Sequence, residues 1–173
     1  MNLIRVLKHL FIETGRVKRV LPPLALERAR KAITVAEARH RGEIRFVIEA
    51  ALPWSYLRRD LSTRARALMM FSKLRVWDTE ENIGILLYLN LADRHIEIVA
   101  DRAIARVVPQ AEWDAICREF QALWRQRQYS DSVVACIERL SDRLAQHFPH
   151  YTAPHDGRAS QKANELPDMP VVL

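Results

Sequence analysis

The chain has 173 residues, of which 49% are hydrophobic and 28% charged, as expected of one globular domain with a real core. Its four glycines and two cysteines argue against a glycine-rich phosphate loop and against a disulfide scaffold. The net charge of +6 comes from residues 1–31, which hold eight Lys or Arg against two Glu, so the rest of the chain is balanced. Because nucleic-acid-binding surfaces carry a basic stripe with stacking aromatics or a recognition motif, we expect no nucleic-acid partner.

Residues 1–21 form a basic amphipathic segment whose apolar side chains recur at helical spacing: Leu3, Ile4, Leu7, Leu10 and Phe11. The chain lacks the ~18-residue apolar run of a membrane-spanning helix and the ~7–15-residue apolar core of a secretory signal. We therefore expect a cytoplasmic protein. The segment has two interpretations. In one it attaches the protein peripherally to the inner membrane, through the anionic surface or a membrane protein. In the other it docks on its own domain and covers an apolar groove.

The remaining elements follow from periodicity. Helices are expected over residues 24–40, 61–75, 111–128 and 130–148, and strands over 43–49, 83–91 and 95–101. The apolar run 83–91 is typical of a strand buried on both faces, whereas 95–101 alternates like a half-covered strand. The order helix–strand–helix–strand–strand–helix–helix predicts an α/β fold with a small mixed sheet and helices on both faces. Residues 150–173 show no periodicity, and we expect a disordered tail there.

Three stretches resemble the TPM domain, a family named after a thylakoid lumen protein, a photosystem II repair protein and a nematode receptor modulator. They are AEARHRGEIRFVIE (36–49), LRVWDTEENIGILLYLNLADRHIEIVADRAI (74–104), and the helical end with EWDAICREF (112–120) and RLAQHFP (143–149). The resemblance places the domain at residues 22–149 and implies a Rossmann-like α/β sandwich. The chain looks most like short bacterial members, without the signal peptide and Gly-rich membrane-anchored tail of many relatives.

The predicted topology also indicates a site. The first two strands are parallel and the third runs back, so Gly42-Glu43, the loop 78–84 and Asp101-Arg102 converge at one edge of the sheet. These pieces match the family motifs Ser-Gly-Glu, Asn-Gly and Ala-Asp-Arg-Gly. Oxygen ligands of the kind that Ca²⁺ or Mg²⁺ prefers are available there. The candidate metal ligands are Glu43, Asp78, Glu81, Asn82 and Asp101, with Glu80 next to them.

The alternative is that these acidic residues are solvated or cap the next helix, Asp101 capping the turn that begins at Arg102. The chain also departs from the family motifs at Arg41, Ile83 and Ala103, which weakens the expected metal site rather than the fold.

Some members of the family bind calcium, and an acid phosphatase activity has been attributed to plant relatives. Two functions from different classes therefore follow from the resemblance. The first is a binding or interaction module that depends on a divalent cation. The alternative is a metal-dependent acid phosphatase, a phosphomonoesterase. No catalytic residue is assigned, because the sequence offers carboxylates at a sheet edge without a recognisable acid or base in a cleft.

Overall fold

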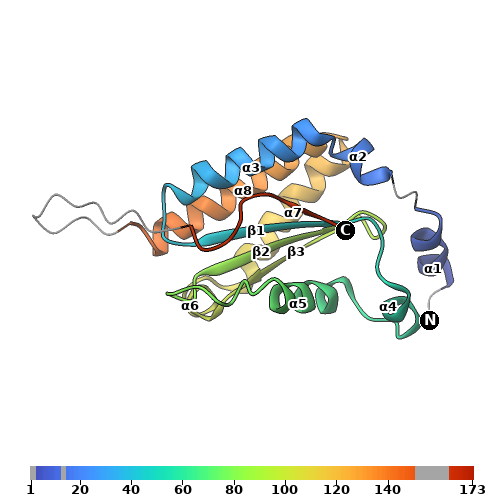
Figure 1. Cartoon of the computed structure of the whole chain (residues 1–173), viewed down its shortest axis with the longest axis horizontal. Coiled ribbons are helices and arrows are strands. Elements are labelled where there is room, and N and C mark those ends of the chain that lie inside the picture. The colour runs from blue at the N-terminus through green and yellow to red at the C-terminus, as the bar shows by residue number, and fades with distance from the viewer. Residues whose placement is uncertain (1–2, 13–14, 151–163) are drawn as a thin grey trace, which may run out of the picture.

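A four-stranded mixed sheet forms the centre of the computed structural model, which describes residues 3–12, 15–150 and 164–173. Within these ranges the strand order is β3-β2-β1-β4 (Figure 1). The strands are β1 (Glu43–Glu49), β2 (Gly84–Asn90), β3 (His95–Ala100) and β4 (Val171–Val172). β1 pairs in parallel with β2 and with β4, and β2 pairs antiparallel with β3. The predicted α/β class, with two parallel strands and a hairpin, is confirmed.

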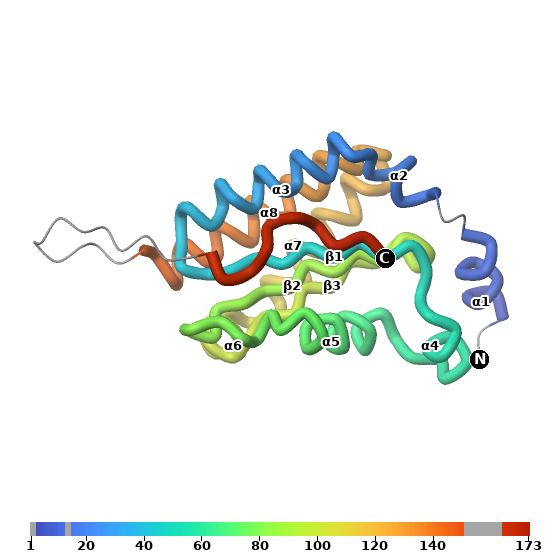
Figure 2. Tube along the Cα trace, in the orientation of Figure 1, coloured from blue at the N-terminus to red at the C-terminus, as the bar shows by residue number. Residues whose placement is uncertain are grey.

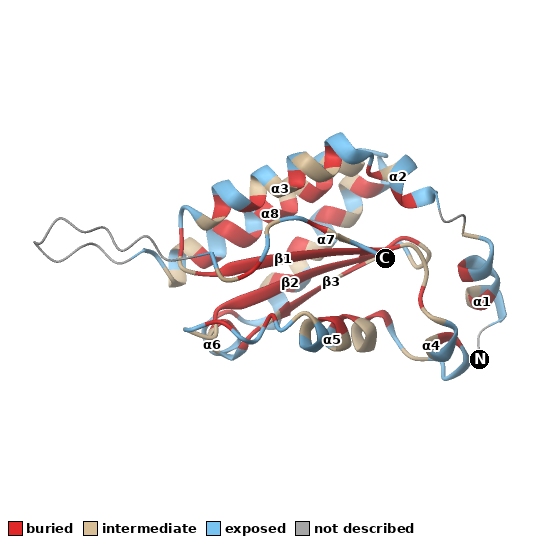
Figure 3. Cartoon of the chain, in the orientation of Figure 1, coloured by how far each residue is buried: buried red, intermediate tan, exposed pale blue. Residues whose placement is uncertain are grey.

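Helices cover both faces of this sheet. On one face lie α3 (Pro23–Glu37), α7 (Gln110–Arg125) and α8 (Tyr129–His147), and on the other lies α5 (Thr63–Lys73) (Figure 1). Neighbouring residues of a strand point to opposite faces, so Leu87 packs in the core under α3, α7 and α8, and Leu86 packs against α5. Every residue of β1 and β2 is buried (Figure 3), which explains the apolar run that marks β2.

The ends of the helices follow local signals. Pro23 occupies the first turn of α3, where a missing N–H costs no hydrogen bond. The Ser62 hydroxyl caps α5 by accepting a hydrogen bond from the amide of Ala65 at 3.1 Å. The last long helix, α8, begins at Tyr129, one residue before the expected start at 130.

Four short helices complete the described part of the fold. α6 (Arg102–Val107) follows β3, and α4 (Trp54–Arg58) lies between β1 and α5. α2 (Arg16–Val20) packs Val17 into the core under α3. Together with α1 (Leu3–Leu10), helices α2 and α4 lie around one end of the sheet, the end at which β1 and β2 finish (Figures 1 and 2).

The ordered path of residues 164–173 corrects the expectation of a disordered tail at 150–173; residues 151–163 lie outside the described part of the chain. Val171 and Val172 pair with Val47 and Ile48 as β4, and the amide of Leu173 donates to the Ile48 carbonyl at 2.9 Å. The segment occupies the edge of β1 that β2 leaves open, so its backbone groups are paired. A two-residue strand is too short to show periodicity, which is why the sequence pattern missed it.

Candidate functional site

The predicted convergence at the amino-terminal ends of β1 and β2 is confirmed for the backbone. Glu43 pairs with Gly84 in the parallel ladder, and the amide of Asp101 donates to the Gly84 carbonyl at 2.9 Å. Gly84 has no room for a side chain, because an added Cβ would lie 1.8 Å from the carbonyl oxygen of Val76. The first strand, the 78–84 loop and the end of β3 therefore meet at this edge, as the topology predicts.

The side chains at this edge mostly face protein partners. Glu43 is buried and accepts a hydrogen bond from the amide of Leu166 at 3.2 Å. Glu81 forms an ion pair with Arg41, and the Asn82 side-chain oxygen accepts from the Arg102 guanidinium at 2.8 Å. In the described part of the chain, no group of three or more His, Cys, Asp or Glu is placed to hold a metal ion.

The other two predicted ligands differ from each other in their surroundings. Asp78 is half-exposed, with its carboxylate 4.0 Å from the Arg75 guanidinium. Asp101 is buried and caps α6, where its Oδ1 accepts from the amide of Arg102 at 2.7 Å. Its Oδ2 is buried without a hydrogen-bond partner among the described residues. The expected cap is thus present, and cation binding at this edge stays a prediction.

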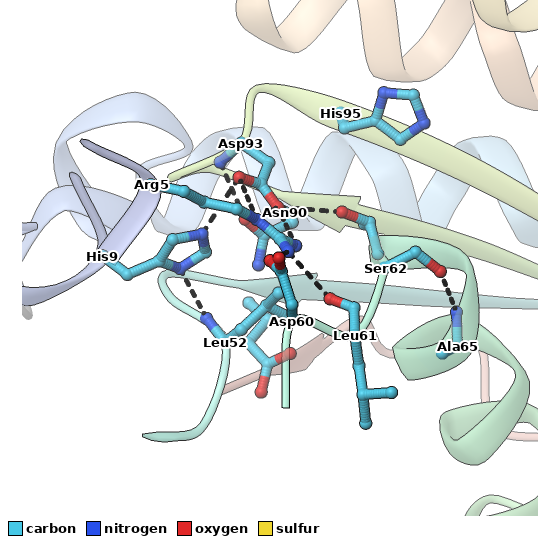
Figure 4. A network of polar contacts seen from close by, with 12 residues as sticks. Arg5, His9, Leu52, Asp60, Leu61, Ser62, Ala65, Asn90, Asp93 and His95 are labelled. Atoms are coloured by element: carbon cyan, nitrogen blue, oxygen red, sulfur yellow. Dashed lines mark hydrogen bonds and ion pairs between the residues drawn. The ribbon is translucent and has the colours of Figure 1, made fainter. Parts of the chain in front are cut away.

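The opposite end of the sheet carries a denser polar cluster, centred on Asp93 in the turn between β2 and β3 (Figure 4). The Asp93 carboxylate accepts hydrogen bonds from Arg5 Nη2 at 2.9 Å, His9 Nε2 at 3.0 Å and Thr63 Oγ1 at 2.9 Å. The Asp93 amide donates to the Asn90 side-chain oxygen at 2.9 Å, which fixes the turn. We call Arg5, His9, Thr63 and Asp93 the Asp93 cluster.

The protonation states within the Asp93 cluster follow from its partners. Burial raises the pKa of the Asp93 carboxyl, but hydrogen bonds from Arg5, His9 and Thr63 outweigh burial and lower the pKa to about 2. His9 Nδ1 lies 2.9 Å from the amide of Leu52, which can only donate. The ring proton is therefore on Nε2, facing Asp93. Since both ring nitrogens of His9 are occupied, the cluster is built to hold α1 in place rather than to transfer protons.

The hydrogen bonds of the Asp93 cluster fix which side of α1 faces the domain. Arg5 and His9 contact Asp93, and between them Val6 packs on Leu52 and Leu57. The apolar stripe points the other way, with exposed fractions from 43% for Leu7 to 82% for Phe11. Leu3, Ile4 and Leu10 are likewise more than half exposed. Helix α1 does dock on its own domain, as one interpretation expected, but through the edge that carries Arg5, Val6 and His9, and among the described residues the stripe covers no groove.

A second buried network lies close by, at the ends of β1 and β2. The Arg66 guanidinium forms a two-point ion pair with the Glu49 carboxylate, with Nε–Oε2 at 2.9 Å and Nη2–Oε1 at 2.5 Å. The buried Tyr88 hydroxyl donates to the same carboxylate. Burial and the negative charge of Glu49 raise the pKa of Tyr88, so this hydroxyl keeps its proton. The network ties α5 to the centre of the sheet.

Sequence reasoning placed the site at the amino-terminal edge and missed the Asp93 cluster. Its members lie far apart in the sequence, and each of them, considered alone, has the character of an ordinary surface residue. One local signal was available: Asn90 and Asp93 flank a tight turn, and such residues fix turns by hydrogen bonding to the backbone. Nothing in the pattern of α1 indicated that its charged edge, rather than its apolar stripe, faces inward.

Comparison with known proteins identifies the family. A TPM domain profile matches residues 18–143. The NMR structure of the BA42 protein from the psychrophilic bacterium Bizionia argentinensis superposes with a TM-score of 0.72 at 25% identity, covering 86% of this chain and 92% of that one. A search among curated proteins gave no match. No helix in the described ranges has the length and apolar character to span a membrane. The profile covers most of the sheet and its flanking helices, and the chain belongs to the TPM domain family.

Proposed function

We propose that the protein is a non-catalytic binding module that attaches peripherally to an anionic membrane surface through α1. The observation that carries the proposal is the orientation of this helix. Five apolar side chains on one stripe are exposed, and the opposite edge of the helix is bonded to the domain. An apolar stripe of this kind on a folded surface marks a contact with a membrane or another protein.

Exposed positive charges on α1 and on the segments at the same end of the sheet favour an anionic membrane. Lys8 on α1 and Lys18 on α2 are exposed. Arg58 at the end of α4 and Arg59 directly after it are also exposed, and α4 is the helix that packs against Val6. Each Lys or Arg near an anionic surface contributes about 1 kcal/mol, and burial of a whole Leu, Ile or Phe side chain contributes about 1.5–3 kcal/mol. Several partly inserted side chains and these charges together support reversible, salt-sensitive attachment.

The docked position of α1 also lowers the cost of binding. A short helix that is free in water is mostly unfolded and must be ordered when it binds. Here the hydrogen bonds of Arg5 and His9 to Asp93 hold the helix in a fixed orientation. Its stripe is therefore presented ready to insert, and little conformational entropy remains to be lost.

We do not extend the proposal to a metal-dependent phosphatase, because no observation on the described residues favours it. The predicted carboxylates face Arg41, Arg102 and the Leu166 amide rather than one another. The polar cluster at the other end of the sheet uses both nitrogens of its histidine for structure. Dependence on a divalent cation likewise stays a prediction, with its own test in the Discussion.

The test compares two pairs of exposed apolar residues. Leu10→Ser with Phe11→Ser removes part of the stripe, and Leu24→Ser with Val35→Ser removes equally exposed side chains from α3. Co-sedimentation with mixed vesicles of phosphatidylcholine and the anionic lipid phosphatidylglycerol measures the bound fraction. We expect wild type and the α3 variant to bind and the α1 variant to lose most binding. Equal binding by both variants, or none by wild type, would refute the proposal.

A further inference from the structure

A groove of about 580 Å³ is lined by four arginines. Arg16 comes from α2, Arg94 from the turn between β2 and β3, and Arg125 and Arg127 from the end of α7 and the turn after it. Figures 1 and 2 show these segments gathered at the same end of the sheet as α1. We call this groove the arginine pocket.

The positive charge of the arginine pocket is not compensated within the described chain. None of its four guanidinium groups has a carboxylate partner among the described residues, whereas surface arginines such as Arg28 and Arg39 do. Asp93 is the one acidic residue among the described lining residues. Its carboxylate already accepts hydrogen bonds from Arg5, His9 and Thr63, so it offsets Arg5 rather than the pocket.

The backbone does not explain why arginine stands at two of these positions. Arg94 has a φ of 52° and Arg127 a φ of 62°, both in the left-handed region that glycine or asparagine adopts with less strain. Each follows a tight turn, with the Arg94 amide donating to the Leu91 carbonyl at 3.3 Å and the Arg127 amide to the Trp124 carbonyl at 3.1 Å. The turns themselves therefore do not require arginine at positions 94 and 127.

We propose that the arginine pocket binds a phosphate monoester group. Such a group carries about −1.5 to −2 charges at pH 7 and offers several acceptor oxygens, which match guanidinium donors in charge and in geometry. One wall is aromatic: Trp124 is buried with its ring centroid 4.6 Å from that of Tyr129, and it suits the organic part of an ester. Bare inorganic phosphate is therefore the poorer ligand.

The same chemistry is available from a lipid headgroup and from a soluble phosphate ester. The lipid source rests on the proposed function, because Asp93 both lines the arginine pocket and holds α1. A pocket at that position lies at the end of the molecule that carries the apolar stripe. The two together would hold an anionic lipid by its headgroup while α1 inserts beside it.

The first arm of the experiment uses a soluble ester and needs no membrane. Glycerol 3-phosphate is titrated into ¹⁵N-labelled protein, and the backbone amides of Arg94 and Arg127 and the indole N–H of Trp124 are followed. We expect saturable shifts that weaken at least tenfold in Arg94→Gln with Arg127→Gln. The matched control, Arg106→Gln with Arg118→Gln, removes two exposed arginines outside the pocket and should keep the wild-type affinity. Equal weakening in both variants, or no saturable shift in wild type, would overturn the proposal.

The second arm identifies the source. Vesicles containing phosphatidic acid are compared with phosphatidylglycerol vesicles of equal surface charge. A preference for phosphatidic acid that disappears in Arg94→Gln with Arg127→Gln supports a lipid headgroup; saturable binding of glycerol 3-phosphate without that preference supports a soluble ester. The stripe variant Leu10→Ser with Phe11→Ser separates the two proposals. It should lose vesicle attachment and still bind glycerol 3-phosphate, so failure of one proposal is visible without failure of the other.

Discussion

Replacing Asp93 by asparagine should release α1 from the domain while leaving the sheet folded. Asparagine keeps the shape of the side chain and can still accept hydrogen bonds, but it removes the charge that Arg5 faces. The fall of the Asp93 pKa from 3.8 to about 2 corresponds to roughly 2 kcal/mol in favour of the ionised form. The side chain is only 15% exposed, so solvent screening reduces this figure little. Loss of roughly 2 kcal/mol lowers the equilibrium constant for docking of α1 by about 30-fold.

Hydrogen exchange of residues 3–10 measures this release directly. At pH 7 we expect about 30-fold faster exchange of the α1 amides in Asp93→Asn, with little change in β1 and β2. A matched control is Asp142→Asn, which removes a carboxylate from a half-exposed pair with Arg39 and should leave α1 protected.

The contribution of Asp93 to docking of α1 should depend on pH in a defined direction. Because folding lowers the pKa of Asp93, its contribution is fully present above about pH 4 and is lost as the pH falls through about 2. Wild type and Asp93→Asn should therefore differ at pH 5 and become alike near pH 2. Unchanged protection of α1 in the variant at pH 7, or a difference that persists at pH 2, would show that the Asp93 charge does not hold the helix.

Three further predictions concern the domain itself. Gly84→Ala should prevent folding or lower stability by at least about 3 kcal/mol, because its Cβ would meet a backbone carbonyl, whereas Gly15→Ala meets nothing within 4 Å and should leave the melting temperature unchanged. Glu49→Gln should cost about 3–5 kcal/mol in urea unfolding, since it leaves the Arg66 charge buried without its partner; a loss below 1 kcal/mol would contradict this. If calcium binds at the amino-terminal edge, millimolar calcium should raise the melting temperature of wild type but not of Asp101→Asn, and an unchanged wild type would exclude a cation site there.

The parts of the fold that the sequence predicted are those set by local pattern. The apolar run at 83–91 predicts a fully buried central strand, and β2 is buried at every position. The alternation at 95–101, directly after this strand, predicts the antiparallel partner β3. Strand direction then places Glu43 and Asp101 at one edge by topology alone. Each of these inferences needs only neighbouring residues and the geometry of a sheet.

What the sequence did not predict depends on contacts between distant segments. β4 consists of two residues that pair with the middle of β1, and no short-range pattern distinguishes them from a loop. The orientation of α1 is set by Arg5 and His9 meeting a carboxylate more than 80 residues away. An amphipathic helix normally buries its apolar face, and only the geometry of this cluster reverses that expectation.

The parallel pairing of β4 with β1 also constrains the order in which the molecule assembles. During synthesis, β1 emerges early and can pair with β2 once residues 84–90 have followed. Its other edge must wait until residues 171 and 172 have been made, because Val47 and Ile48 find their partners only there. Throughout that interval β1, which is buried at every position in the folded protein, presents unpaired N–H and C=O groups along one edge, the arrangement that recruits strands from other chains. A nascent or C-terminally truncated chain is therefore the form of this protein most prone to aggregate or to bind a chaperone.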